Sequence, residues 1–288
     1  MRPTERIDYQ PIEGRAPVRL PGGARVAVWV VVNVEEWSDS EPMPRTVLTP
    51  PAGGTPSPDV PNWAWHEYGN RVGFWRMLRV LDRHRIPATL AINGSAIGAY
   101  PPITQAALAR DWEFIGHGYT QKNMQKVPDE RRDIERTRDA IAAVTGAAPR
   151  GWLGPGLTET WETPDLLVES GYEYVCDWVL DDQPTRLRTR AGDIVNIPYT
   201  QECNDVAMML IQHHPAEEYR RRAVDQFDQL LADARADDSA RVMALVVHPY
   251  IMGAPHRLKY LDLALDHIRR HGEATFHTGA DILDAWAC

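Results

Sequence analysis

Hydrophobic positions along the chain follow two alternating patterns. Eight short runs, rich in β-branched residues, have the continuous or alternating apolar pattern of strands. They span residues 25–34, 87–93, 113–117, 150–154, 172–177, 194–199, 241–248 and 274–277. Amphipathic segments lie between them, at residues 73–85, 103–110, 129–144, 164–170, 216–234 and 259–270. Their spacing predicts helices that cover one face of a sheet.

This alternation predicts an α/β fold in which parallel strands are joined by right-handed helical crossovers. No G-x-G-x-x-G follows the first strand and no G-x-x-x-x-G-K-[ST] occurs in the chain, so the usual phosphate cradles are missing. A closed or nearly closed barrel therefore fits better than a dinucleotide-binding sheet. We expect one catalytic barrel domain over residues 1–288, with its active site at the carboxyl ends of the strands.

Residues 38–70 interrupt the pattern with seven prolines and the pair Gly53-Gly54. Such a composition predicts neither a helix nor a central strand. Because the segment directly follows the first strand, we expect a functional loop at the active-site end of the barrel. A disordered or subunit-contacting arm is the alternative.

Polar side chains recur where the predicted strands end. Because the carboxyl ends of parallel strands meet at one end of a barrel, these side chains are expected to converge on one pocket. They are Asn33, Glu35 and Glu36 after the first strand, His117 after the third, Asp177 and Trp178 after the fifth, Tyr199, Glu202 and Asn204 after the sixth, and His248 after the seventh.

Four of these residues are the strongest catalytic candidates. His248 ends a wholly apolar run, and a histidine in an apolar wall can be tuned to exchange protons near neutral pH. His117 is flanked by glycines, which would let the backbone approach a ligand closely. Glu35 and Glu36 point to opposite faces of an extended strand, so only one easily faces the pocket, and the pattern does not say which. A hydrogen-bonded core histidine and an ordinary glycine turn are the alternatives for the first two.

Composition narrows the choice of partners. The net charge of -9 and pI of about 5.6 come without a basic stripe, which argues against nucleic acid and membrane surfaces. The longest apolar run has seven residues and the N-terminus is charged, so we expect a cytoplasmic protein with a small-molecule substrate. Tryptophans near the proposed mouth could pack on a sugar or flat heterocycle, or simply in the core; they are Trp37, Trp63, Trp65, Trp152 and Trp178.

Together these residues resemble the polysaccharide deacetylase superfamily, and within it the branch with cofactor-independent allantoinases and cyclic imidases. The resemblance extends from about residue 25 to residue 286. It is carried by residues 33–36 (NVEE), 116–119 (GHGY), 151–152 (GW), 172–174 (YEY) leading to Asp177, 197–200 (IPYT) ahead of Asn204-Asp205, and His248. The resemblance implies a distorted, deacetylase-like (β/α) barrel of about seven strands, hydrolysis of an amide carbon–nitrogen bond, and frequently a homo-oligomer.

Metal-dependent members of this family hold a divalent ion with an acid and two histidines spaced H-x-x-x-H. By resemblance, Glu35 matches the metal-binding acid, Asn33 the carboxylate base, His117 the first histidine and His248 a late catalytic histidine. Gln121 stands where the second histidine is expected. Glutamine is a poor ligand for zinc-like ions.

A further departure is Leu153, which stands where the family usually has the arginine that orients the base. These changes favour the ureide or imide branch over chitin or peptidoglycan deacetylation. They leave the cofactor open between none and a weakly held, zinc-class divalent metal at Glu35, His117 and Gln121.

The expected activity is the opening of a small cyclic amide, imide or ureide by an amidohydrolase. Glu35 or Glu36 would act as base or metal ligand, His248 as general acid to the leaving nitrogen, and His117 as electrophile, base partner or ligand. The expected substrate-binding residues are Asn33, Trp152, Asp177, Trp178, Tyr199, Glu202 and Asn204. N-deacetylation of an amino sugar or polysaccharide is one alternative, and a non-catalytic small-molecule-binding barrel is another.

Overall fold

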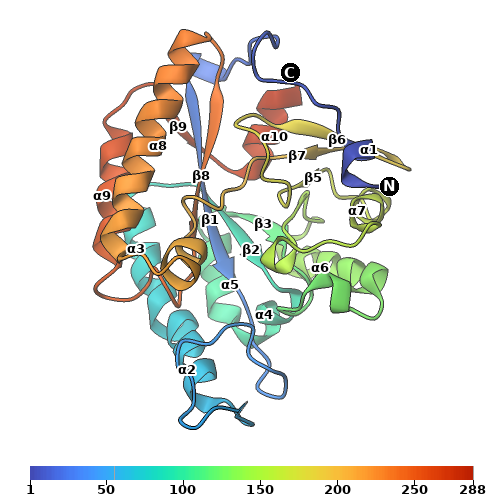
Figure 1. Cartoon of the computed structure of the whole chain (residues 1–288), viewed down its shortest axis with the longest axis vertical. Coiled ribbons are helices and arrows are strands. Elements are labelled where there is room, and N and C mark those ends of the chain that lie inside the picture. Colours follow the sequence, from blue (N-terminus) through green and yellow to red (C-terminus); the bar gives the residue numbers. More distant parts are fainter. Residues whose placement is uncertain (55, 288) are drawn as a thin grey trace.

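A curled, mostly parallel sheet forms the centre of the computed structural model, which describes residues 1–54 and 56–287 (Figure 1). The strands run in the order β6-β7-β5-β4-β3-β2-β1-β8, and β9 pairs with β1. They are β1 Val26–Val34, β2 Ala88–Ile92, β3 Glu113–Gly116, β4 Gly151–Trp152, β5 Tyr174–Val175, β6 Thr185–Thr189, β7 Gly192–Asn196, β8 Arg241–Val247 and β9 Ala274–His277. Within this part of the chain, the pairing of β6 with β7 is antiparallel and the others are parallel.

The sheet is surrounded by helices, most of which cover its outer face (Figure 1). They are α1 Pro3–Arg6, α2 Val60–Tyr68, α3 Phe74–His84, α4 Gly94–Ala99, α5 Pro101–Leu108, α6 Glu130–Thr145, α7 Thr163–Glu169, α8 Ala216–Ala236, α9 Leu258–Arg269 and α10 Gly279–Ala287. Short 3₁₀ turns occupy Pro21–Gly23, Met124–Lys126 and Pro155–Leu157, and π-helical turns occupy Gly69–Gly73 and Val206–Ile211. None of the helices in the described residues is both long and apolar enough to cross a membrane.

The barrel predicted from the sequence is confirmed as a half-barrel. β8 forms one edge of the sheet and the β6–β7 hairpin the other, and an isolated parallel bridge between Asn204 and Val246 lies beside β8. The sheet therefore curls without closing completely.

Strand β1 lies at the centre and is buried along its whole length. Its even-numbered residues, such as Val28 and Val30, belong to the core beneath the outer helices. Its odd-numbered residues, such as Trp29 and Val31, belong to a second core inside the barrel. Because side chains alternate along a strand, Asn33 follows Trp29 and Val31 on the interior side, at the carboxyl end.

Two expectations about secondary structure were wrong. The sixth predicted strand, residues 194–199, corresponds to β7, which ends earlier, at Asn196, and its antiparallel partner β6 was not predicted. Strand β6 lies at the sheet edge and buries only Leu187 fully, so its sequence lacks the apolar pattern that would have revealed it.

The Pro-rich segment at 38–70 also contains a helix, α2. Pro61 lies in the first turn of α2, where its missing N–H removes no helical hydrogen bond. The Asp59 carboxylate caps this turn by accepting a hydrogen bond from the Asn62 backbone N–H, at 3.3 Å. The prolines therefore position the start of the helix and do not prevent it.

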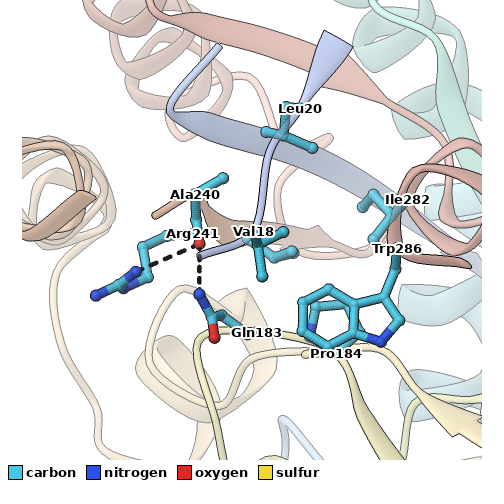
Figure 2. A pocket seen from close by; sticks show the side chains of 9 residues that line it. Val18, Leu20, Gln183, Pro184, Ala240, Arg241, Ile282 and Trp286 are labelled. Carbon is cyan, nitrogen blue, oxygen red and sulfur yellow. Dashed lines mark hydrogen bonds between the residues drawn. The ribbon is translucent and has the colours of Figure 1, made fainter. Parts of the chain in front are cut away.

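The amino-terminal end of the barrel is filled by apolar side chains (Figure 2). Val18 and Leu20 of the N-terminal arm face Ile282 and Trp286 of α10 there. Nearby, Gln183 Nε2 donates a hydrogen bond to the Ala240 carbonyl, at 2.9 Å. Polar side chains gather at the opposite end of the barrel.

Candidate active site

Glu35, His117 and His248 meet at the carboxyl end of the barrel. The Glu35 Oε1 atom lies 4.0 Å from His117 Nε2 and 3.6 Å from His248 Nε2. The three residues are 3%, 3% and 5% exposed, respectively, so their charges interact through protein and not through bulk water. The three residues directly follow β1, β3 and β8, and any two of them are at least 82 positions apart in the sequence.

His248 is held by Asp205, a residue that sequence reasoning did not select. Its Nδ1 atom lies 2.6 Å from Asp205 Oδ1, and its backbone N–H donates to Asp205 Oδ2 at 2.8 Å. The Met252 backbone N–H donates to the same Oδ2 atom, at 3.2 Å. Because the carboxylate accepts, Nδ1 carries the proton and Nε2 faces Glu35.

His117 is oriented by a backbone carbonyl. Its Nδ1 atom lies 2.7 Å from the Leu153 carbonyl oxygen, which can only accept, so Nδ1 carries the proton. Burial lowers the pKa of His117, although the nearby Glu35 carboxylate opposes this shift. In the neutral ring Nε2 is an unprotonated acceptor, and it faces Glu35.

Glu35 is a buried carboxylate with one engaged oxygen. Its Oε2 atom accepts a hydrogen bond from Trp37 Nε1 at 2.6 Å. Burial raises the pKa of Glu35, but His248, His117 and His66 and the Trp37 N–H together hold this pKa below its usual range. Glu35 therefore stays ionised at neutral pH and presents Oε1 to the two catalytic candidates.

Glu36 points away from this cluster. Its Oε2 atom accepts a hydrogen bond from the Ser95 hydroxyl of α4 at 2.9 Å. Its backbone N–H donates to Asn93 Oδ1, also at 2.9 Å. The choice that the strand pattern left open is thus decided in favour of Glu35.

An aromatic group packs beside Glu35. The ring of His66, from α2, stacks on Trp37 with centroids 4.2 Å apart, and Tyr250 meets the same indole edge-on at 5.2 Å. Trp65 packs against Trp37 and Tyr250 at 6.3 and 5.0 Å. Both His66 ring nitrogens and the Tyr250 hydroxyl are buried without a hydrogen-bond partner among the described residues. The sequence analysis missed His66 because it lies in the Pro-rich segment and not at a strand end.

Two glycines allow this aromatic group to form. A Cβ atom on Gly69 would lie 2.4 Å from the Tyr250 backbone nitrogen, and one on Gly73 would lie 2.1 Å from the Pro249 carbonyl oxygen. The π-helical turn at Gly69–Gly73 therefore packs directly against the backbone that follows His248.

Asn33 and Tyr199 lie inside the barrel mouth. Asn33 Nδ2 donates to the Tyr199 hydroxyl at 3.2 Å, while Asn33 Oδ1 is buried and has no partner in the described part of the chain. Burial raises the pKa of Tyr199 well above its usual value, so this hydroxyl remains protonated. Asn33 thus offers a free amide oxygen at the carboxyl end of β1.

Three other predicted binding residues make their contacts outside the Glu35 cluster. Trp152 is fully buried in a core cluster with Tyr172, outside the barrel. The Glu202 side chain is 72% exposed and pairs with Arg222 at 3.3 Å. Asn204 uses its Oδ1 atom locally, accepting from the Val206 N–H at 3.0 Å.

Asp177 forms an acidic pair with Glu159, and Trp178 bonds to this pair. Asp177 Oδ1 accepts from the Gly154 N–H at 2.8 Å, and Trp178 Nε1 donates to Glu159 Oε1 at 2.9 Å. Burial and the proximity of the two acids raise the pKa of Glu159 to about 7 and that of Asp177 well above its usual value. Both shifts favour the protonated form of this carboxyl pair.

The residues expected by resemblance to hold a metal do not form a ligand set. The Gln121 amide oxygen accepts a hydrogen bond from Asn93 Nδ2 at 3.1 Å, and the second Glu35 oxygen is engaged by Trp37. Of the ligand atoms expected by resemblance, only His117 Nε2 and Glu35 Oε1 remain free. A catalytic zinc site usually has three protein ligands, so this set is too small.

Comparison with known proteins places this geometry among deacetylase-like folds. The family model described as polysaccharide deacetylase matches residues 65–175. A Schizosaccharomyces pombe protein with the name "Putative polysaccharide deacetylase" is 26% identical to this chain. The match covers 93% of this chain and 92% of the Schizosaccharomyces pombe protein.

Two solved structures are similar over nearly the whole chain. A crystal structure of PuuE allantoinase has a TM-score of 0.84 at 24% identity, covering 97% of this chain and 98% of its own. A probable polysaccharide deacetylase from Pseudomonas aeruginosa PAO1 has a TM-score of 0.82 at 26% identity, with 95% of each chain covered.

Proposed function

This chain belongs to the polysaccharide deacetylase superfamily, and from that premise we propose that it hydrolyses a carbon–nitrogen bond of a small cyclic amide, imide or ureide. Hydrolysis of amide carbon–nitrogen bonds is the reaction of the deacetylases and allantoinases that it resembles, and the chain is an enzyme of this kind. The substrate class is the new part of the proposal.

The observation that carries the proposal is the enclosure of the Glu35 cluster. All three residues are at most 5% exposed, and Trp37 and Tyr250 pack beside them. A polymer chain needs an open groove over the reacting atoms, whereas a small ring can be enclosed. Flat aromatic walls also suit a planar amide or imide ring.

In the proposed mechanism, Glu35 activates water. The Glu35 Oε1 atom and the His117 Nε2 atom are both acceptors and lie 4.0 Å apart, so one water molecule can donate to both. Glu35 removes a proton as the water oxygen attacks the substrate carbonyl carbon. The depressed pKa of Glu35 keeps it in the required ionised form.

Glu35 then passes the proton taken from water to the Nε2 atom of His248, 3.6 Å away, and His248 delivers it to the leaving nitrogen as the carbon–nitrogen bond breaks. Asp205 stabilises the protonated imidazole, and Nε2 is the atom that faces the site. Burial holds the pKa of Tyr250 well above its usual value, so its free hydroxyl can donate to the developing oxyanion. The free Asn33 Oδ1 atom can accept from a substrate N–H. No step passes through a metal.

N-deacetylation of an amino sugar is the second candidate, and a groove on the molecule supports it. The groove lies between the β6–β7 hairpin and β8 and is lined by the N-terminal arm, Trp178, Leu180 and Tyr199. Tyr199 also bonds to Asn33, so the groove reaches the barrel mouth. A sugar chain could lie there.

Turnover assays separate the two candidates. The purified full chain is tested with allantoin, hydantoins, succinimide and N-acetylglucosamine oligomers, with Glu35→Gln as the inactive control. We expect the wild-type chain to open the ring of at least one cyclic compound and the Glu35→Gln control to lose this activity. Release of acetate from the oligomers with no ring opening would replace the proposal with the second candidate.

A further inference from the structure

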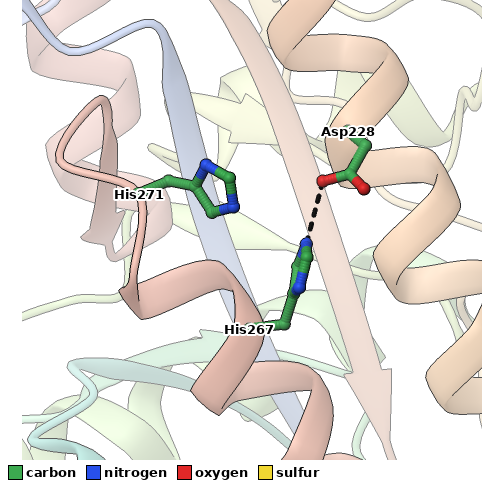
Figure 3. A group of neighbouring side chains, drawn as sticks. All are labelled: Asp228, His267 and His271. Carbon is green, nitrogen blue, oxygen red and sulfur yellow. Dashed lines mark hydrogen bonds and ion pairs between the residues drawn. The ribbon is translucent and has the colours of Figure 1, made fainter.

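Three side chains with metal-binding atoms, Asp228, His267 and His271, lie close together outside the Glu35 cluster (Figure 3). Asp228 comes from α8, His267 from α9, and His271 from the turn that follows α9. One ligand atom of each lies within 4.8 Å of the other two. His267 Nε2 and Asp228 Oδ1 are already in contact, at 2.8 Å.

The two imidazoles are held in place by packing. His267 and His271 are four residues apart, which brings them to the same side of a helix end. Both rings pack edge-on against Phe227, with centroid distances of 6.1 and 5.1 Å. The ring centroids of the two histidines are 5.1 Å apart. Because both side chains are half-buried, little rotational freedom remains to be lost on binding a ligand.

The chemistry of these donors selects a class of ion. Two imidazoles and one carboxylate suit zinc and similar transition metals, whereas calcium and magnesium prefer oxygen ligands alone. Zinc bonds of about 2.0–2.2 Å would draw the three groups around one ion and leave a fourth position for water. The exposed Asp228 side chain can make this adjustment at little cost.

We propose that Asp228, His267 and His271 form a binding site for a zinc-class divalent ion that ties α8 to α9. These helices flank β8 in the chain, and α8 and α9 pack against each other. The site shares no residue with the Glu35 cluster. An ion that binds the folded chain and not the unfolded one stabilises the fold by mass action.

Zinc titration of the metal-stripped full chain tests the proposal by calorimetry and by thermal unfolding. Wild type is expected to bind zinc at this site and to show a higher Tm with zinc. His267→Ala and His271→Ala should each weaken zinc binding at least about tenfold, since even partners outside the coordination sphere cost about 10–100-fold. His213→Ala, which removes an exposed histidine outside the triad, is the matched control and should bind as wild type does.

Two results would overturn the proposal. One is an unchanged zinc Kd in the double variant H267A/H271A; the other is loss of the zinc-dependent Tm rise in Glu35→Gln, which would put the ion at the catalytic cluster. Both readouts are independent of turnover, so the outcome does not depend on the proposed substrate.

Discussion

The His248 imidazole donates its Nδ1 proton to Asp205, 2.6 Å away, and turns Nε2 toward Glu35. The same carboxylate accepts the backbone N–H of His248 at 2.8 Å, so Asp205 sets both the ring tautomer and the position of the residue. This relationship makes Asp205 the positioning residue for the proposed general acid.

Asp205→Asn should lower kcat by about 10²-fold or more, with a smaller effect on KM. An amide offers one acceptor oxygen where the carboxylate offers two, so it can bond to both the backbone N–H and the ring only by donating its own N–H to Nδ1, which moves the ring proton to Nε2 and blocks proton uptake there. Steady-state kinetics and a pH profile measure the effect. Wild-type kcat with an unchanged profile would show that the tautomer of His248 is not used.

Glu35→Gln and Glu36→Gln form a matched pair of neighbouring substitutions. Removing the base at Glu35 should lower kcat by about 10²–10⁴-fold. Glu36→Gln should change kcat little, because Glu36 bonds to Ser95 and not to the catalytic candidates. If the larger loss followed the change at Glu36, the assignment of the base would be wrong.

Trp37→Phe should move the acidic limb of the kcat/KM profile to higher pH. The Trp37 N–H stabilises the Glu35 carboxylate, so its loss raises the pKa of Glu35 and protonates the base at a higher pH than in wild type. Trp65→Phe is the control, since Trp65 packs on Trp37 at 6.3 Å and no hydrogen bond joins it to Glu35. An equal shift in both variants would attribute the effect to packing.

Gly73→Ala should lower both stability and activity. Its Cβ atom would lie 2.1 Å from the Pro249 carbonyl oxygen, and the resulting backbone shift, next to His248, should cost about 1–3 kcal/mol of unfolding free energy. Gly98→Ala in α4 meets no atom within 4 Å and should stabilise by about 0.4–1 kcal/mol. Urea unfolding compares the two, and equal stability changes would contradict the close approach.

Incubation with a chelator should leave ring-opening activity intact. The expected ligand Gln121 bonds to Asn93, and water activation is assigned to Glu35 and His117. Assays before and after chelation, with metal content measured in parallel, test this. Activity that disappears on chelation and returns with zinc would require a metal in the mechanism.

Much of the barrel follows from local pattern. The continuous apolar runs of β1 and β8 reflect burial on both faces, which any window of the sequence reveals. Strand β6 was not predicted because an edge strand needs few apolar residues. Helix α2 was not predicted because composition alone does not distinguish a proline in the first helical turn from one in a loop.

What the sequence alone determined is therefore the fold class and the placement of Glu35, His117 and His248 at strand ends. Only the tertiary structure decided that Glu35, and not Glu36, faces the two histidines, and that His66 and Asp205 lie with them. The physical reason is that strand pattern follows from local burial. Hydrogen bonds such as Asp205 to His248, 43 positions apart, depend on how the curled sheet brings distant segments together.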